Sequence, residues 1–233
     1  EYIDEADDEF DMMRQLYAQK RAGAFVFLGS RLDDRCEAVR AMGVPCVFAT
    51  VDAAARDFGC ASSVSIDDSA AACAVMDGLL QKGHRHIAIF GGNPEGDDPI
   101  ARRYQGAAQS VASHGVAFDP AHAFREVRFS MEGGYECAKA YFTEHPEVTA
   151  VFAMSDAIAA GVIRALHELG RRVPEDVSVA GFDGTQMARY FIPSIATVSQ
   201  PVESIAKESV ELLRELMDGG DARHVTVDYR LVD

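Results

Sequence analysis

At positions 172–184 the chain reads Arg172-Val-Pro-Glu-Asp-Val-Ser-Val-Ala-Gly-Phe-Asp183-Gly184. Residues 177–180 are a short apolar, β-branched run of the kind that a buried parallel strand needs, and residues 181–184 then force a turn. Asp183 therefore follows the carboxyl end of a strand, where open α/β sheets bind their ligands. An Asp at this position either recognises a ligand or stabilises the turn. On this stretch alone the turn role is favoured.

The order of strand followed by helix recurs along the whole chain. Apolar runs that end in glycine or a polar loop alternate with segments whose apolar residues repeat at helical spacing. This alternation predicts an α/β protein with a doubly wound parallel sheet. The predicted strands are 24–28, which we expect to be buried, 44–48, 64–66, 87–92, 124–129, 149–155, 177–180, 196–199 and an edge strand over 224–232. A helix is predicted over 33–42, among others.

Charge and cysteine content limit the classes of protein to which this chain can belong. The 233 residues include 37 Asp and Glu against 22 Lys and Arg, which gives a formal net charge of −15. Such a surface repels a phosphate backbone, so we expect no nucleic-acid binding by this chain itself. The five cysteines contain no C-x-x-C pair, which indicates reduced thiols in a reducing cytoplasm. Since no apolar run approaches membrane-spanning length, we expect no membrane partner.

Residue spacing argues against three kinds of chemistry. The glycines of 91–96 are not followed by the Lys-Ser/Thr of a phosphate-binding loop. His84 and His86 have no third ligand at metal-binding spacing. No Ser stands in G-x-S-x-G, and no Cys lies beside a His in a recognisable motif. We therefore expect no enzymatic activity, no cofactor and no metal.

Polar and aromatic residues gather instead after the ends of the predicted strands. Arg103 follows the strand that ends at residue 92. Phe129, Ser155-Asp156 and Asp183 follow the next three strands. Each has a plainer explanation, as a surface charge, a core ring, a helix cap or a turn residue. Together they predict a cleft with one aromatic face and charged hydrogen-bonding groups, which suits a small polar ligand such as a sugar or a nucleobase.

Five segments form a recognisable series: 83–92 (GHRHIAIFGG), 103–106 (RYQG), 155–161 (SDAIAAG), 173–183 (VPEDVSVAGFD) and 192–201 (IPSIATVSQP). In this order and at this spacing they resemble the effector-binding domain of the lactose/galactose repressor (LacI/GalR) family. The resemblance covers nearly the whole chain from Gly23 onward. It implies a periplasmic-binding-protein-like (type I) fold, with two doubly wound parallel-sheet subdomains and a ligand cleft between them. It also implies a homodimer that represses transcription and binds operator DNA only through a helix-turn-helix headpiece.

The resemblance assigns roles to individual residues. It implies that Arg103 contacts the effector, that Phe129 stacks on it and that Asp183 accepts hydrogen bonds from it. Two positions depart from the family pattern. Ser155 stands where many sugar-responsive members have Asn, and Thr50 stands where an acidic residue often occurs, so both weaken the case for a particular sugar. The candidate ligand-binding residues are Arg103, Phe129, Asp183, Ser155, Thr50 and Gln200.

The resemblance also implies how the chain is divided. We expect an N-terminal subdomain over 1–63, a C-terminal subdomain over 64–199, a return to the first subdomain over 200–222 and an edge strand of the second over 223–233. The first βαβ unit of the N-terminal subdomain has no counterpart in this sequence, so we expect the chain to be part of a longer protein.

Two other functions share this kind of fold. A periplasmic-type sugar-binding protein of a transporter is the first, and the repressor-like motifs at 83–84 and 173–176 argue against it. The second is an enzyme on a flavodoxin-like fold, because fold does not determine function. An enzyme would need an activated nucleophile or a cofactor fingerprint, and the sequence shows neither.

Overall fold

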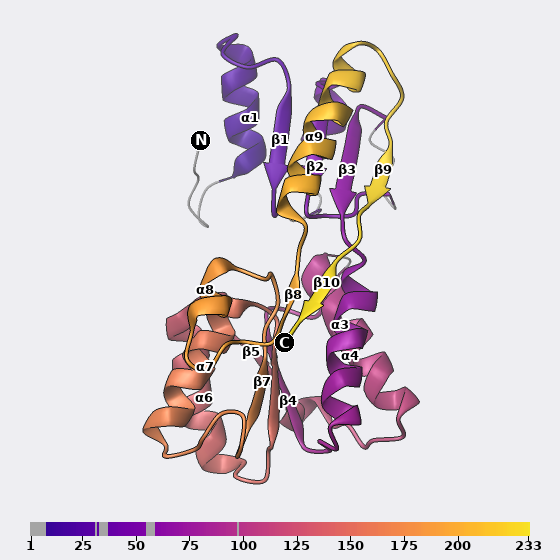
Figure 1. The fold of residues 1–233 in the computed structure, drawn as a ribbon. Helices are drawn as coiled ribbons and strands as arrows, with labels where there is room; N and C mark the ends of the chain where they lie inside the picture. Colours follow the sequence, from indigo (N-terminus) through magenta and orange to yellow (C-terminus); the bar gives the residue numbers. More distant parts are fainter. Residues whose placement is uncertain (1–7, 31, 33–36, 55–58, 97) are drawn as a thin grey trace. The chain divides into compact units, whose positions relative to one another are not determined.

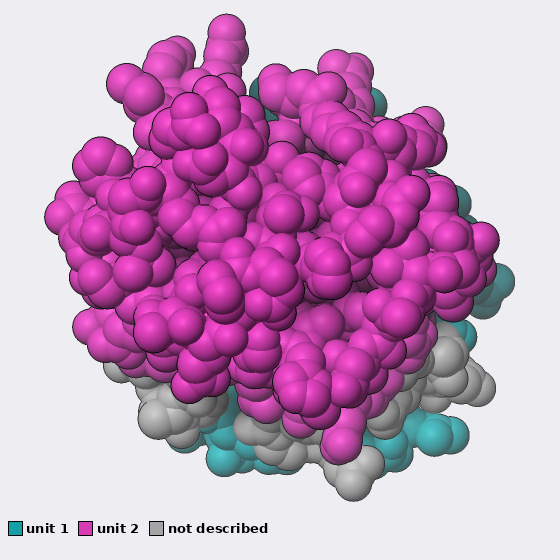
Figure 2. All heavy atoms as spheres, turned by 90° about the horizontal axis from the view of Figure 1, so that it is seen from below, with its two compact units in different colours: residues 1–66, 201–227 teal, residues 67–200, 228–233 magenta. Residues whose placement is uncertain are grey.

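The computed structural model describes residues 8–30, 32, 37–54, 59–96 and 98–233, and the chain forms two compact units. Unit 1 contains Glu1–Ile66 and Pro201–Val227, and unit 2 contains Asp67–Gln200 and Asp228–Asp233 (Figure 2). The first residues of the helix predicted over 33–42, including Cys36, lie outside the described residues. No helix within the described ranges is both long and apolar enough to cross a membrane.

Within the described residues, unit 1 is a four-stranded parallel sheet with helices on both faces (Figure 1). Its elements are α1 (Glu9–Ala18), β1 (Phe25–Leu28), α2 (Glu37–Met42), β2 (Cys46–Ala49), β3 (Ala61–Ser65), α9 (Val202–Met217) and β9 (His224–Thr226). The strand order is β1-β2-β3-β9. One face packs against α1 and α2 through a cluster that includes Phe10, Phe27 and Phe48. The other face packs against α9, whose Ile205 and Leu212 share a cluster with residues of β2 and β3.

The predicted burial of the first strand is wrong. Val26 and Leu28 are 46% and 76% exposed, while Phe27 between them is buried. Among the described strands, β1 is the outer one of the sheet, next to β2. Val26 pairs with Val47, which shares a cluster with α9, so Val26 lies on the α9 face of the sheet. The buried side chains of α9 cover β2 and β3, so Val26 stays exposed. The prediction failed because an apolar run alone does not distinguish a central strand from an edge strand.

Unit 2 is built on a second parallel sheet, with helices on both sides (Figure 1). Its elements include α3 (Asp68–Gln81), β4 (Ile87–Gly91), α4 (Pro99–Ser113), α5 (Pro120–Ala123), β5 (Phe124–Glu126), α6 (Met131–Glu144), β6 (Ala150–Ala153), α7 (Asp156–Glu168), β7 (Ser178–Ala180) and α8 (Gln186–Tyr190). The strand order is β5-β4-β6-β7, and α3 packs against α4 while α6 packs against α7. All four strands are parallel, so their carboxyl ends lie at one edge of the sheet.

The segment predicted as one edge strand over 224–232 forms two strands in different units. β9 pairs in parallel with β3 of unit 1. β10 (Arg230–Val232) pairs antiparallel with β8 (Thr197–Ser199) of unit 2. The chain passes from one unit to the other between them, at Val227 and Asp228. The alternating sequence continues through this crossing, so it did not indicate the break.

Replacing each of two helix glycines by alanine should change the stability of the protein in opposite directions. At Gly161 in α7 a Cβ would lie 2.0 Å from the carbonyl oxygen of Met131, whereas at Gly78 in α3 nothing lies within 4 Å. We expect Gly161→Ala to lower the free energy of unfolding by roughly 1–3 kcal/mol, because α6 and α7 must move apart. Gly78→Ala should raise it by about 0.5–1 kcal/mol through helix propensity. Urea denaturation measures both, and a stabilised Gly161→Ala variant would contradict the close helix contact.

Candidate functional site

Arg103 is a buried cation beside the switch point of the unit 2 sheet. From β4 the chain runs to β5 on one side and then to β6 on the other, and open α/β sheets bind ligands at such a point. Asp98 caps the start of α4 and Pro99 occupies its first turn, two features that fix where this helix begins. This start places Arg103 in the first part of α4, close to the carboxyl ends of the strands.

Three neighbours hold the guanidinium group of Arg103. Its Nε donates to Oδ1 of Asp68 at 2.8 Å, and its Nη1 donates to the carbonyl oxygen of Met154 at 2.8 Å. Its Cζ lies 3.7 Å from the centre of the Phe182 ring. A charged partner, a carbonyl and an aromatic face together fix the orientation of the cation.

Asp183 lies on the segment that leaves β7, and its Oδ1 is 3.7 Å from Nη1 of Arg103. Its φ is +112°, in a region that residues other than glycine rarely adopt. Its N–H donates to the carbonyl oxygen of Val198 at 3.0 Å, and Nε2 of Gln200 donates to its Oδ1 at 3.0 Å. Strained backbone of this kind concentrates at functional sites, where the surrounding structure holds it in place.

The charges around Asp183 limit the kind of ligand that fits. Burial raises the pKa of Asp183 to about 6, and the nearby Arg103 offsets this only in part, while Asp156 and Asp68 add negative charge. Burial also raises the pKa of Asp68, against the lowering effect of Arg103. Arg103 thus lies beside two carboxyl groups, and Asp156 adds further negative charge near one of them, Asp183. The arrangement favours a neutral ligand with hydrogen-bond donors and disfavours an anion such as a phosphate ester.

Phe129 and Ser155 stand at the same edge of the sheet as Asp183. β5 ends at Glu126, earlier than predicted, so Phe129 lies in the loop before α6. The residue is 41% exposed, and its ring is close enough to Gly92 that a Cβ there would lie 3.1 Å from it. Ser155 is 4% exposed, and its hydroxyl oxygen caps α7 by accepting from the N–H of residue 158.

The remaining two candidate residues lie in different units. Thr50 follows β2 in unit 1, with a φ of +67°. Gln200 ends the long segment of unit 2 and donates to Asp183. The structure therefore brings Arg103, Asp183 and Gln200 into one charged, hydrogen-bonded group, with Phe129 on the same sheet edge.

The sequence-based prediction did not include Asp68 or Phe182 in the site. Both contact Arg103, and both contacts join residues that are distant in the sequence. The sequence offered only the adjacent pair Asp67-Asp68 at the start of a predicted helix. In the structure Asp67 caps α3 by accepting from the N–H of residue 70, and Asp68 is left to pair with Arg103. Phe182 carried no signal beyond its place beside Asp183.

Comparisons with known proteins agree with this architecture. A model of the periplasmic binding protein-like domain family matches residues 76–233. The ribose operon repressor of Haemophilus influenzae is 33% identical over 149 residues, which are 64% of this chain and 44% of that protein. The transcriptional repressor CytR of Escherichia coli is 31% identical over 220 residues, which are 94% of this chain and 62% of that protein. The chain thus spans only 44% to 62% of the length of these relatives.

A solved structure of a transcriptional regulator has a similar fold. The LacI family transcriptional regulator from Silicibacter pomeroyi has a TM-score of 0.80 and 25% identity, and the match covers 97% of this chain and 83% of that one. The family model covers well over half of the chain, and all five sequence motifs lie within the residues that it matches. The chain therefore belongs to the periplasmic binding protein-like domain family, in its LacI/GalR branch.

Proposed function

We propose that the chain is the effector-sensing and dimerisation domain of a LacI/GalR-type transcriptional repressor, and that its effector is a sugar. The observation that carries the proposal is the pairing of Arg103 with Asp183 beside the switch point of the unit 2 sheet. The similarity to a ribose operon repressor supports a sugar. A net charge of −15 opposes DNA contact by the chain itself. In this proposal the operator DNA is therefore bound by a headpiece outside this chain.

The site chemistry suits the hydroxyl groups of a neutral sugar. A hydroxyl accepts from the guanidinium of Arg103 and donates to the carboxylate of Asp183, and hydrogen bonds to charged groups contribute roughly 1.5–3 kcal/mol each. The exposed ring of Phe129 offers a surface for the apolar face of a sugar ring. The roles of Ser155 and Thr50 as ligand contacts rest on the family resemblance alone.

A periplasmic-type sugar-binding protein of a transporter is the alternative with the same fold. The relatives reported above are named as repressors, which favours regulation over transport. We infer a non-enzymatic regulator that works in the cytoplasm, where scattered reduced thiols are stable. A sugar-binding protein of a transporter would bind the sugar equally well but would show no effect on any operator.

Two titrations of the full-length protein test the proposal. Calorimetry against D-ribose and a panel of other pentoses and hexoses should identify a sugar that binds. Operator DNA, selected from random sequences, is then titrated with and without that sugar, and we expect the affinities to differ by about 5- to 150-fold. Equal affinities would remove the regulatory switch, and a failure of every sugar to bind would remove the proposed effector class.

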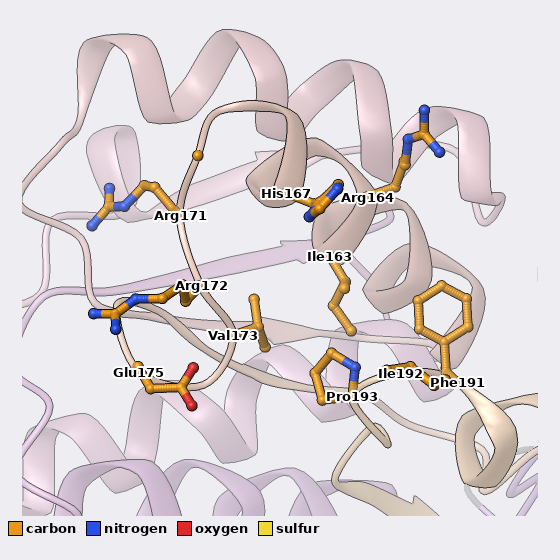
Figure 3. Close-up of a pocket in the computed structure, with 11 residues that line it drawn as sticks. Ile163, Arg164, His167, Arg171, Arg172, Val173, Glu175, Phe191, Ile192 and Pro193 are labelled. Carbon is orange, nitrogen blue, oxygen red and sulfur yellow. The ribbon is translucent and has the colours of Figure 1, made fainter.

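An apolar surface on unit 2 supports the dimer. A cavity of about 610 Å³ lies between α7, the loop after it and the segment that follows α8. Ile163, Val173 and Pro193 line this cavity close to one another, and three arginine side chains extend outward around it (Figure 3). Nearby, Ile192 is 92% exposed and Tyr190 is 71% exposed, and contiguous apolar exposure of this kind marks contact surfaces. A second copy related by a twofold axis would cover this surface.

Ile192→Asp should therefore weaken the dimer by at least about tenfold, because association would bury a carboxylate without a partner. Sedimentation velocity over a range of protein concentrations measures the dissociation constant. Leu231→Asp is the control, since Leu231 is 56% exposed as well but lies on β10. A dimer that survives Ile192→Asp unchanged would place the interface elsewhere.

A further inference from the structure

Asp156 is a fully buried carboxylate whose two oxygens accept hydrogen bonds from outside its own helix. Oδ2 accepts from the N–H of Thr185 at 2.6 Å and from its hydroxyl at 2.8 Å. Oδ1 accepts from the hydroxyl of Thr197 at 2.6 Å. Ser155 already caps the start of α7, so the carboxylate of Asp156 is not needed as the helix cap. It instead links the start of α7 to the loop after β7 and to β8.

Asp156 also holds the backbone of the segment 181–185. Its N–H donates to the carbonyl oxygen of Phe182 at 2.7 Å. The N–H of Gly184 donates to the hydroxyl of Thr197 at 3.2 Å, and that hydroxyl in turn donates to Asp156. The segment that carries the site carboxylate is therefore tied to Asp156 at several points.

The packing at this place leaves no room for side chains at the two neighbouring glycines. A Cβ on Gly181 would lie 2.5 Å from Oδ1 of Asp156, and a Cβ on Gly184 would lie 2.4 Å from the Cα of Ser199. Asp183 lies between these glycines with a φ of +112°. A strained conformation of this kind persists only when the surrounding structure determines it.

We propose that Asp156 is a positioning residue for effector recognition: through Thr185 and Thr197 it fixes the segment that holds the Asp183 carboxylate beside Arg103. The consequence for binding rests on the proposed function, but the positioning itself does not require an effector. A carboxylate with only a general folding role could lose one of these hydrogen bonds without any local change at Asp183.

The first measurement needs no ligand. In the full-length protein, the pKa of Asp183 is read from the ¹³C NMR titration of its carboxyl carbon, and in the parent we expect it at about 6. Thr185→Val removes no charge, but it removes the hydroxyl that donates to Asp156 and accepts from the N–H of Ala188 at the start of α8. The pKa of Asp183 should therefore fall toward its ordinary value as the carboxyl loses its burial. Thr185→Ser restores the hydroxyl and should keep the pKa of the parent. The groups that face this carboxyl are Arg103, Asp156, Asp68 and Gln200.

The second measurement is the affinity for D-ribose, or for the member of the sugar panel that binds best, by calorimetry at about pH 8. We expect Thr185→Val and Asp156→Asn each to weaken binding about tenfold, and Thr185→Ser to stay within about twofold of the parent. Glu168→Gln is the matched control. Glu168 also accepts hydrogen bonds from three side chains, but it lies at the surface on the last turn of α7. This variant should match the parent in both measurements.

The outcomes separate the two proposals. A lower pKa of Asp183 and weaker sugar binding in Thr185→Val, both rescued by Thr185→Ser, would support the positioning role. An unchanged pKa of Asp183 in Thr185→Val, with parent-like binding by Asp156→Asn, would overturn it. If the parent binds no sugar, the proposed function fails, and the pKa comparison still decides the positioning role. If Asp156→Asn does not fold, the two Thr185 variants decide alone.

Discussion

Replacing Arg103 with methionine should lower the free energy of unfolding by about 3–5 kcal/mol, the usual cost of removing one partner of a buried ion pair. Asp68 is 3% exposed and would lose the cation that now lies 2.8 Å from its Oδ1, so a buried carboxylate would remain without its partner. The same change should weaken effector binding by about a hundredfold or more, because a buried, charged hydrogen-bond donor is lost. Urea denaturation measures the first effect, and calorimetry at a temperature where the variant is folded measures the second.

Arg223→Met is the control for the stability effect. Arg223 also pairs with a carboxylate, that of Glu215, but the two side chains are 54% and 50% exposed. Exposed pairs contribute only about 0–1 kcal/mol. Adding Asp68→Asn to the Arg103→Met variant should recover part of the lost stability, because the unpaired buried charge is then absent. If Arg103→Met is as stable as the parent, the buried ion pair does not stabilise the fold.

The neighbourhood of Arg103 and Asp183 could be predicted because it depends on topology more than on detailed packing. Each residue follows the carboxyl end of a strand, and parallel strands place these ends at one edge, so residues far apart in the sequence meet within 3.7 Å. Which carboxylate pairs with Nε of Arg103 could not be predicted. Asp67 and Asp68 are adjacent, and only the packing of α3 against α4 directs the first to the helix cap and the second to Arg103.

β1 and the segment 224–232 show a second limit of the sequence. An apolar run fits a central strand and an edge strand equally well, and alternation continues across the point where the chain leaves unit 1. Whether a strand lies at the edge, and with which strand it pairs, depends on segments that are distant in the sequence. The local pattern of apolar residues therefore does not reveal it. The positive φ of Asp183 could not be predicted either. Gly184 beside it indicates a turn, but the strain at Asp183 arises because β8 and Asp156 hold the loop in place.

Asp183→Asn should stabilise the free protein at about pH 8. Burial raises the pKa of Asp183 to about 6, above its ordinary value, so the unfolded chain ionises this group more readily than the folded one. Ionisation therefore opposes folding: the effect is absent below the ordinary pKa of aspartate, grows as the pH rises between the two pKa values and is complete above about pH 6. Asn avoids this cost and tolerates a positive φ well. We expect a gain on the order of 1 kcal/mol after allowing for the partial exposure of the carboxyl group.

Effector binding should respond to the same substitution in the opposite direction. In the parent, the ionised carboxylate of Asp183 accepts from the ligand, so the affinity should be constant above about pH 7 and should decrease below about pH 6 as the group takes up a proton. Asp183→Asn should bind about a hundredfold more weakly at pH 8 and show no such pH dependence, because it has no proton to gain. Calorimetry from about pH 5 to pH 8 measures both profiles, with Glu168→Gln as the variant that should follow the parent. A parent affinity that does not change across this interval would mean that the Asp183 carboxylate is not the acceptor for the effector.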